Sequence, residues 1–251
     1  MAKRWLLAPL AVGLIGCSQE PPKAEAPQAE APVAVSEPAP EPAPEASGTV
    51  IRFKPPVGVA ERYRNTVRVE QSQEGAEGMP AGPHSLTMET LVEAKAVANG
   101  ENFQIEEKVI EAKVTGTGML EAQAAQMQAQ RQGQSRTYQR NELGEPVRDP
   151  NTPGAIPLLV TLPQVGLAPG FKWTAQMLIS PALMGIEYTV TDLTPDDVRL
   201  EGRLFGEGVS QEKPLLITLN ARTGQVKTME GSVAVVRNGV LSTISIQQSP
   251  A

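Results

Sequence analysis

Apolar and polar residues alternate with a period of two through most of the chain. In residues 62–70, Tyr63, Val67 and Val69 share one parity, and charged residues occupy most of the other. The same alternation returns in residues 86–98. Successive side chains of a strand point to opposite faces, so this pattern predicts strands with one buried and one solvent-facing side.

Short turn signals separate the alternating segments. Asn99-Gly100 and Asn238-Gly239 are typical of two-residue hairpin turns. Thr223-Gly224 and the acidic stretch 194–197 are further turn candidates. Strands joined by such short turns pair with their sequence neighbours, which predicts antiparallel meanders.

One predicted strand changes phase along its length. Phe103 and Ile105 lie on one parity, whereas Ile110 lies on the other. An extra residue in one strand shifts the alternation in this way. The sequence therefore predicts a β-bulge near Glu106 to Val109.

Two stretches depart from the alternation. Residues 119–132 are rich in Ala and Gln and contain no Gly or Pro, which predicts a helix. Residues 151–170 are the most apolar part of residues 48–251, but Pro157, Pro163 and Pro169 interrupt them, so we expect a short helix or an extended crossing loop. The fold class predicted for residues 48–251 is mainly β. About ten antiparallel strands would form a curved sheet, a half-barrel, a barrel or a sandwich, with one or two short helices.

The first residues have the composition of a secretory signal. Lys3 and Arg4 precede an apolar run of about ten residues, which is too short to cross a bilayer that needs about 20. The run ends in Leu14-Ile15-Gly16-Cys17, which resembles the bacterial lipobox. That resemblance implies that residues 1–16 are removed and that Cys17 carries diacylglycerol and an acyl chain such as palmitate. The alternative is an ordinary signal peptide followed by a chance cysteine.

The lipobox resemblance also implies a location. A lipid anchor on Cys17 would hold the protein in the bacterial cell envelope, because several acyl chains bind a membrane firmly where one alone is marginal. In enteric bacteria an Asp after the cysteine favours the inner membrane, and here that position is Ser18. We therefore expect the outer membrane, with the protein facing the periplasm.

Residues 17–47 are predicted to be a disordered tether after the lipidated cysteine. In the 30 residues of 18–47 there are 8 Pro, 8 Ala and 6 Glu. A tract of this composition cannot bury enough apolar surface to offset its chain entropy, and frequent Pro favours extended geometry. It is either a spacer that crosses the zone near the membrane or a passive linker.

Composition excludes several classes of function. The formal charge of −6 disfavours a nucleic-acid partner, because phosphates are repelled. The single Cys rules out an internal disulfide and a Cys₄ zinc site. The only His, His84, lies in a Gly/Pro-rich segment that we expect to be an exposed loop. Neither a His-rich metal site nor a Ser-His-Asp triad fits, so no cofactor, no metal and no catalytic residues are predicted.

The acidic residues do not suggest a catalytic pair either. Glu106 and Glu107 are adjacent in a predicted strand and should point to opposite faces. Asp192, Asp196 and Asp197 surround a predicted turn without the ligand spacing of a calcium loop. We expect turn chemistry there and no bound cation.

The spacing of Leu162-Pro163, Gly170 and Trp173, followed by the Thr223-Gly224 turn, resembles uncharacterised bacterial envelope lipoproteins. The resemblance is loose, and it implies no known activity. The succession of strands and a central apolar segment is also similar to the curved sheets of lipoprotein carriers and receptors, which shelter acyl chains. This second similarity is at the level of fold alone.

One binding site follows from these expectations. If the sheet curves, its concave face and the 151–170 segment could line a hydrophobic ligand; the alternative is that the same side chains form the core. The candidate lining residues are Val67, Val69, Met88, Val92, Ile156, Leu158, Leu159, Leu162, Ile217 and Leu219. The function predicted is therefore a non-catalytic binding role in the envelope, for a hydrophobic or lipid ligand. A structural or assembly role that contacts an envelope protein is the alternative, and an enzyme is the least favoured.

Overall fold

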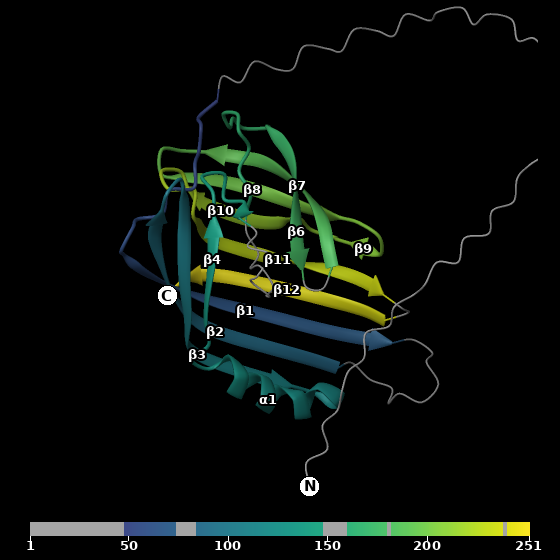
Figure 1. Cartoon of the computed structure of the whole chain (residues 1–251). Coiled ribbons are helices and arrows are strands. Elements are labelled where there is room, and N and C mark those ends of the chain that lie inside the picture. The colour runs from purple at the N-terminus through teal and green to yellow at the C-terminus, as the bar shows by residue number, and fades with distance from the viewer. Residues whose placement is uncertain (1–47, 74–83, 148–159, 180–181, 238–239) are drawn as a thin grey trace, which may run out of the picture. The chain divides into compact units, whose positions relative to one another are not determined.

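A computed structural model shows how the predicted strands associate (Figure 1). It describes residues 48–73, 84–147, 160–179, 182–237 and 240–251. The predicted signal, Cys17, the tether and the Asn238-Gly239 turn lie outside the described residues. Within them, no helix is long and apolar enough to cross a membrane.

Twelve strands and one α-helix with a preceding 3₁₀ turn make up the described fold. The elements are β1 (Ala60–Gln73), β2 (His84–Asn99), β3 (Asn102–Gly116), η1 (Gly118–Leu120), α1 (Glu121–Arg131), β4 (Ser135–Arg140), β5 (Pro146–Val147), β6 (Lys172–Ile179), β7 (Ala182–Leu193), β8 (Asp197–Phe205), β9 (Val209–Ser210), β10 (Leu215–Asn220), β11 (Val226–Arg237) and β12 (Val240–Pro250). The mainly β prediction is confirmed, with twelve strands where about ten were expected.

All twelve strands belong to one antiparallel sheet. The order is β5-β4-β3-β2-β1-β12-β11-β10-β8-β7-β6, and the short β9 pairs with β11. The first and last strands therefore pair with each other in the middle of the sheet. Among the described strands β5 and β6 are the two ends of the sheet and do not pair, so the sheet curves without closing into a barrel.

The strand pairing confirms the predicted alternation. Val67 of β1 lies opposite Met88 of β2 and Ile246 of β12, so these three side chains share one face. The predicted bulge is present. Leu91 pairs with Glu111 and Val92 pairs with Val109, which leaves Ile110, next to Val109, as the extra residue.

Two predicted turns are confirmed by backbone geometry. Gly100 joins β2 to β3 with a φ of 63°, and Gly224 joins β10 to β11 with the same φ. A side chain at Gly224 would also collide with its surroundings, because its Cβ would lie 2.7 Å from the carbonyl oxygen of Arg52. This turn therefore needs glycine for both conformation and space.

The helix predicted in residues 119–132 is also confirmed, as η1 and α1. Only Ala124 of α1 is buried, but two glutamine side chains tie the helix to the free edge of β3. Gln132 accepts from the Ala112 amide at 2.9 Å and donates to the Ile110 carbonyl at 2.7 Å. Gln128 accepts from the Val114 amide at 3.2 Å.

The hydrophobic core lies where the β6–β8 side of the sheet faces β11 and β12, and Figure 1 shows β6 and β7 passing in front of these strands. Two connecting segments complete it. Ile51 and Phe53 come from residues 48–59, and Leu162 and Leu167 from residues 160–171. Thr49 and Leu167 exchange backbone hydrogen bonds of 2.8 Å, and the Trp173 indole donates to Thr161 at 2.8 Å. The described part of the 151–170 segment is an extended crossing loop, one of the two forms expected.

Candidate functional site

The face of the sheet that carries the core is called the inner face below. Strand pairing places its residues in rows that run across the sheet. One row contains Gln248, Asn65 and Thr90, from β12, β1 and β2. The next row contains Ile246, Val67 and Met88, and the one after it contains Ile244, Val69 and Leu86.

Part of the inner face is not packed by the core. Ile246 belongs to the core cluster and Ile244 packs against it, but in the described part of the chain four neighbouring side chains on β1 and β2 neither belong to it nor pack against it. All four are half-buried aliphatic side chains: Val67, Val69, Leu86 and Met88. They form an apolar surface, which we call the apolar wall, on the core-facing side of the sheet.

A polar row borders the apolar wall. Asn65 and Gln248 are half-buried, and Thr90 is buried with 8% of its surface exposed. Among the described residues, none of these three side chains donates or accepts a hydrogen bond. Among all described residues, the Tyr188 hydroxyl is the only fully buried polar side-chain atom without a hydrogen-bond partner. Because the Thr90 hydroxyl also has no partner, it is not fully buried and still faces accessible space.

On the other side of the polar row lies a buried carboxylate. Glu107 of β3 accepts hydrogen bonds from the Tyr63 hydroxyl at 2.5 Å and from the Tyr138 hydroxyl at 2.8 Å. The Arg136 guanidinium donates to the other carboxylate oxygen. Glu107 is 6% exposed, whereas Glu106 is exposed on the outer face. The prediction that these two acids point apart is confirmed.

Burial governs the ionisation of the aromatic and basic groups around this carboxylate. Desolvation raises the pKa of the Tyr63 and Tyr138 hydroxyls far above the usual value, and the negative charge of Glu107 adds to the shift. Desolvation lowers the pKa of Arg140 to about 10. That guanidinium is held by the carbonyls of Gly144 and Val160 at 2.9 Å and lies over the Phe53 ring.

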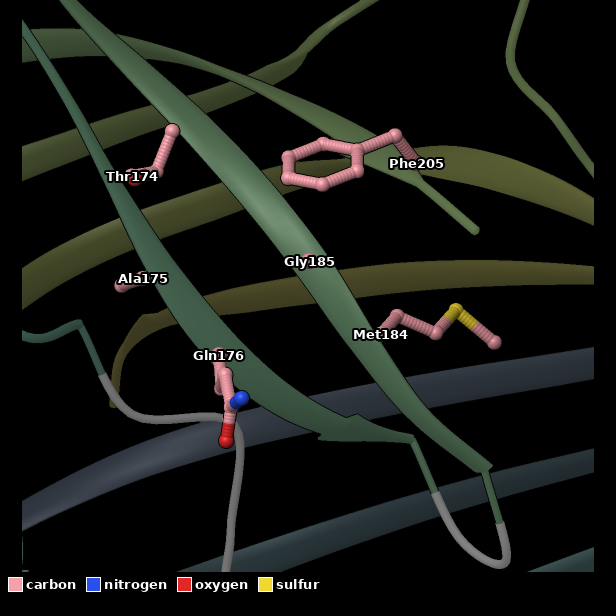
Figure 2. A pocket seen from close by; sticks show the side chains of 6 residues that line it. All are labelled: Thr174, Ala175, Gln176, Met184, Gly185 and Phe205. Atoms are coloured by element: carbon pink, nitrogen blue, oxygen red, sulfur yellow. The ribbon is translucent and has the colours of Figure 1, made fainter. Parts of the chain in front are cut away.

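A pocket of about 410 Å³ lies against the β6–β7 hairpin at one end of the sheet (Figure 2). Its lining residues are uncharged: Thr174, Ala175, Gln176, Met184, Gly185 and Phe205. The Phe205 ring covers Gly185, where an added Cβ would lie 2.2 Å from a ring carbon. None of these six side chains is an acid or a base.

The structure divides the predicted ligand-lining residues into three groups. Val67, Val69 and Met88 lie together on the apolar wall. Leu162, Ile217 and Leu219 are part of the core and present no free surface to a ligand, and Val92 is buried with 4% of its surface exposed. Ile156, Leu158 and Leu159 lie outside the described residues.

The other residues considered for chemistry in the sequence all contact neighbouring parts of the fold. His84 is the first residue of β2, half-buried against Gly118, where we had expected an exposed loop. Asp192, Asp196 and Asp197 each pair with a basic side chain: Arg199, Arg222 and Lys227 respectively. Over the described ranges no cluster of His, Cys, Asp or Glu could hold a metal ion.

The polar row was missed by the sequence reasoning, although the sequence contains a signal for it. Asn65 lies on the same parity as Tyr63 and Val67, so it is a polar residue on the predicted buried side of its strand. A buried polar side chain without a partner is unfavourable, which makes such an exception informative. Glu107 likewise lies on the parity of Phe103 and Ile105, but the sequence does not identify its partners, which come from other strands.

Comparison with known proteins adds no assignment. No family model matches the chain, and none of the curated proteins matches it. Among solved structures, DynF from the dynemicin biosynthesis pathway of Micromonospora chersina aligns over 82% of this chain and 90% of its own, with 10% identity and a TM-score of 0.24. A TM-score this low establishes neither a shared fold nor a shared function.

Proposed function

We propose that this protein is a lipid-anchored envelope protein that binds a hydrophobic ligand and catalyses no reaction. The apolar wall is the observation that carries the binding proposal. Val67, Val69, Leu86 and Met88 are contiguous on the core-facing side of the sheet and are not packed by the core. Aliphatic and Met side chains that keep accessible surface provide a favourable contact for flexible acyl chains.

A paired substitution tests this proposal. Val69→Lys places a charge on the apolar wall, whereas Leu241→Lys places one on the outer face of β12, where Leu241 is already 39% exposed. We expect wild-type protein to bind a hydrophobic fluorescent dye and to carry lipid in native mass spectrometry. Val69→Lys should abolish both signals and Leu241→Lys should preserve them. Wild-type protein with neither signal would overturn the binding role.

The anchor is proposed from the lipobox-like sequence alone. Cys17 would hold the protein in the outer membrane, facing the periplasm, through its acyl chains. Membrane fractionation of cells that express wild type or Cys17→Ala tests it. We expect the wild type to sediment with outer-membrane vesicles and the variant to leave the membrane fraction. A Cys17→Ala protein that still sediments entirely with membranes would contradict a lipid anchor.

One observation favours the alternative assembly role. Val236 and Leu241 lie opposite each other on the outer face of β11 and β12 and are 51% and 39% exposed. Exposed apolar pairs are contact points for protein partners when they belong to a larger patch. Photo-crosslinking in cells from each face separates the two roles. A protein adduct from position 236 favours assembly, and a lipid adduct from position 69 favours ligand binding.

A further inference from the structure

The polar row lies at a defined position beside the apolar wall. Gln248 and Thr90 are the cross-strand neighbours of Asn65, one on each side. Directly opposed side chains in antiparallel strands have Cβ atoms about 5 Å apart. The three side chains therefore form a row whose outer Cβ atoms are about 10 Å apart, and a ligand group with several donors and acceptors can contact all three.

These groups are available for a new partner. In the described part of the chain, the side chains of Asn65, Thr90 and Gln248 have no hydrogen-bond partner. Thr90 is 8% exposed and Asn65 and Gln248 are half-buried, and polar groups in such places are unfavourable unless they bond to water or to a ligand. A ligand that supplies donors and acceptors at this row would satisfy them.

The charges around the row favour an uncharged ligand group. On the side away from the apolar wall, the Glu107 carboxylate is already matched by Arg136 and by the hydroxyls of Tyr63 and Tyr138. Arg136 is paired with Glu107, and the buried Arg140 guanidinium is already bonded to the carbonyls of Gly144 and Val160, so neither cation is available to an anionic ligand. A charge buried without a partner is disfavoured more strongly than a neutral polar group. An ester, amide or hydroxyl therefore fits the row better than a free carboxylate.

The apolar wall lies directly beside the polar row, in the direction along the strands. Met88 and Leu86 follow Thr90 on the inner face of β2, with Val67 and Val69 beside them on β1. Four residues of strand span about 13 Å. This length accommodates part of an acyl chain lying along the strands, with its polar end at the row.

We propose that this site takes a neutral acylated lipid, with its uncharged polar group on Gln248, Asn65 and Thr90 and its acyl chain on the apolar wall. The inference rests on the proposed function and names the ligand class for it. A monoacylglycerol has this chemistry, whereas a fatty acid with the same acyl chain has a carboxylate at the corresponding place. These two lipids are therefore the matched probes.

The test measures binding of both probes to the full chain carrying Cys17→Ala, so that no covalent lipid competes. We expect the monoacylglycerol to bind at least about tenfold more tightly than the fatty acid. Asn65→Leu and Thr90→Val should each weaken monoacylglycerol binding, roughly tenfold for a lost hydrogen bond that leaves its ligand group unpaired. Neither should weaken fatty-acid binding. Thr66→Val, on the outer face of β1, is the matched control and should change neither affinity.

The possible failures are distinguishable. If the fatty acid binds as tightly as the monoacylglycerol, or if Asn65→Leu and Thr90→Val leave monoacylglycerol binding unchanged, the ligand class is wrong and the hydrophobic-ligand function stands. If neither lipid binds and a hydrophobic dye does not bind either, both the ligand class and the proposed hydrophobic-ligand function are wrong. Far-ultraviolet circular dichroism of each variant establishes that the sheet is intact.

Discussion

Glu107 shows how one residue position depends on side chains from distant strands. Its carboxylate is bonded by Tyr63 from β1 and by Arg136 and Tyr138 from β4. Removing one partner of a buried charged pair leaves the other charge buried without compensation. The resulting loss of stability is larger than the net stability that the intact pair contributes. The adjacent Glu106 is exposed and bonds only to the Gln104 side chain.

These two neighbouring acids give a matched pair of variants. Glu107→Gln removes the charge that Arg136 and the two hydroxyls share, so we expect the free energy of unfolding to fall by about 2–3 kcal/mol. Glu106→Gln should change it by less than about 0.5 kcal/mol. Urea denaturation followed by circular dichroism measures both values. Equal effects would show that the buried cluster does not stabilise the fold.

Tyr188 is buried and Tyr63 and Tyr138, the other two tyrosines of the chain, are half-buried, which predicts an unusual alkaline titration. Burial raises the pKa of Tyr63, Tyr138 and Tyr188 above the ordinary value of 10.0. Because the folded pKa is raised, the neutral hydroxyls contribute stability that is complete below pH 10 and falls as the pH rises above it. Absorbance at 295 nm should show no tyrosinate near pH 10, and then a cooperative rise on unfolding. A gradual titration centred on pH 10 in folded protein would contradict this burial.

Sequence alone predicted part of this residue-scale picture. The alternation placed Val67, Val69 and Met88 on a single side, and the structure confirms that they share the inner face. It could not separate them from Ile217 and Leu219, which the core covers completely. Both groups are apolar side chains on the predicted buried side of their strands, and only the three-dimensional arrangement of the strands decides which of them the core covers.

Among the elements, α1 has an uncommon role. Its buried surface is small, and its glutamines satisfy backbone groups along the free edge of β3. An uncovered edge strand can pair with a second chain, and covering it with a helix is one way to prevent this. The Ala- and Gln-rich composition predicted the helix. It could not predict which groups the glutamines bond, because those groups are free only where β3 no longer pairs with β4.

A glutamine substitution tests the edge-covering role. Gln132→Ala removes the bonds to the Ala112 amide and the Ile110 carbonyl, so hydrogen exchange at Ala112 should become faster by about tenfold or more. Gln130→Ala is the control, because Gln130 is exposed on the same helix and forms neither bond. Exchange measured by mass spectrometry over residues 108–116 gives the comparison. Unchanged exchange in the Gln132→Ala variant would show that α1 does not protect this edge.

At the scale of the whole molecule, the chain forms two meanders that meet through their ends. β1 to β5 make one half, β6 to β11 make the other, and β12 joins them by pairing with both β1 and β11. Short turns such as Asn99-Gly100 made the local hairpins predictable. The β1–β12 pairing was not predictable, because it joins segments about 180 residues apart and no local pattern specifies such a partner.

The central position of β12 predicts opposite effects for truncation at the two ends of the chain. Deleting residues 240–251 removes the strand that joins the halves and the buried Ile246, so the protein should lose cooperative thermal unfolding. Deleting residues 1–43 should leave the melting temperature within a few degrees, because residues 44–251 form one compact unit with its own core. Differential scanning calorimetry of the two truncated proteins decides between these outcomes. A cooperative transition without β12 would mean that the two meanders fold independently, and loss of stability without residues 1–43 would mean that the N-terminal region contributes to the β domain.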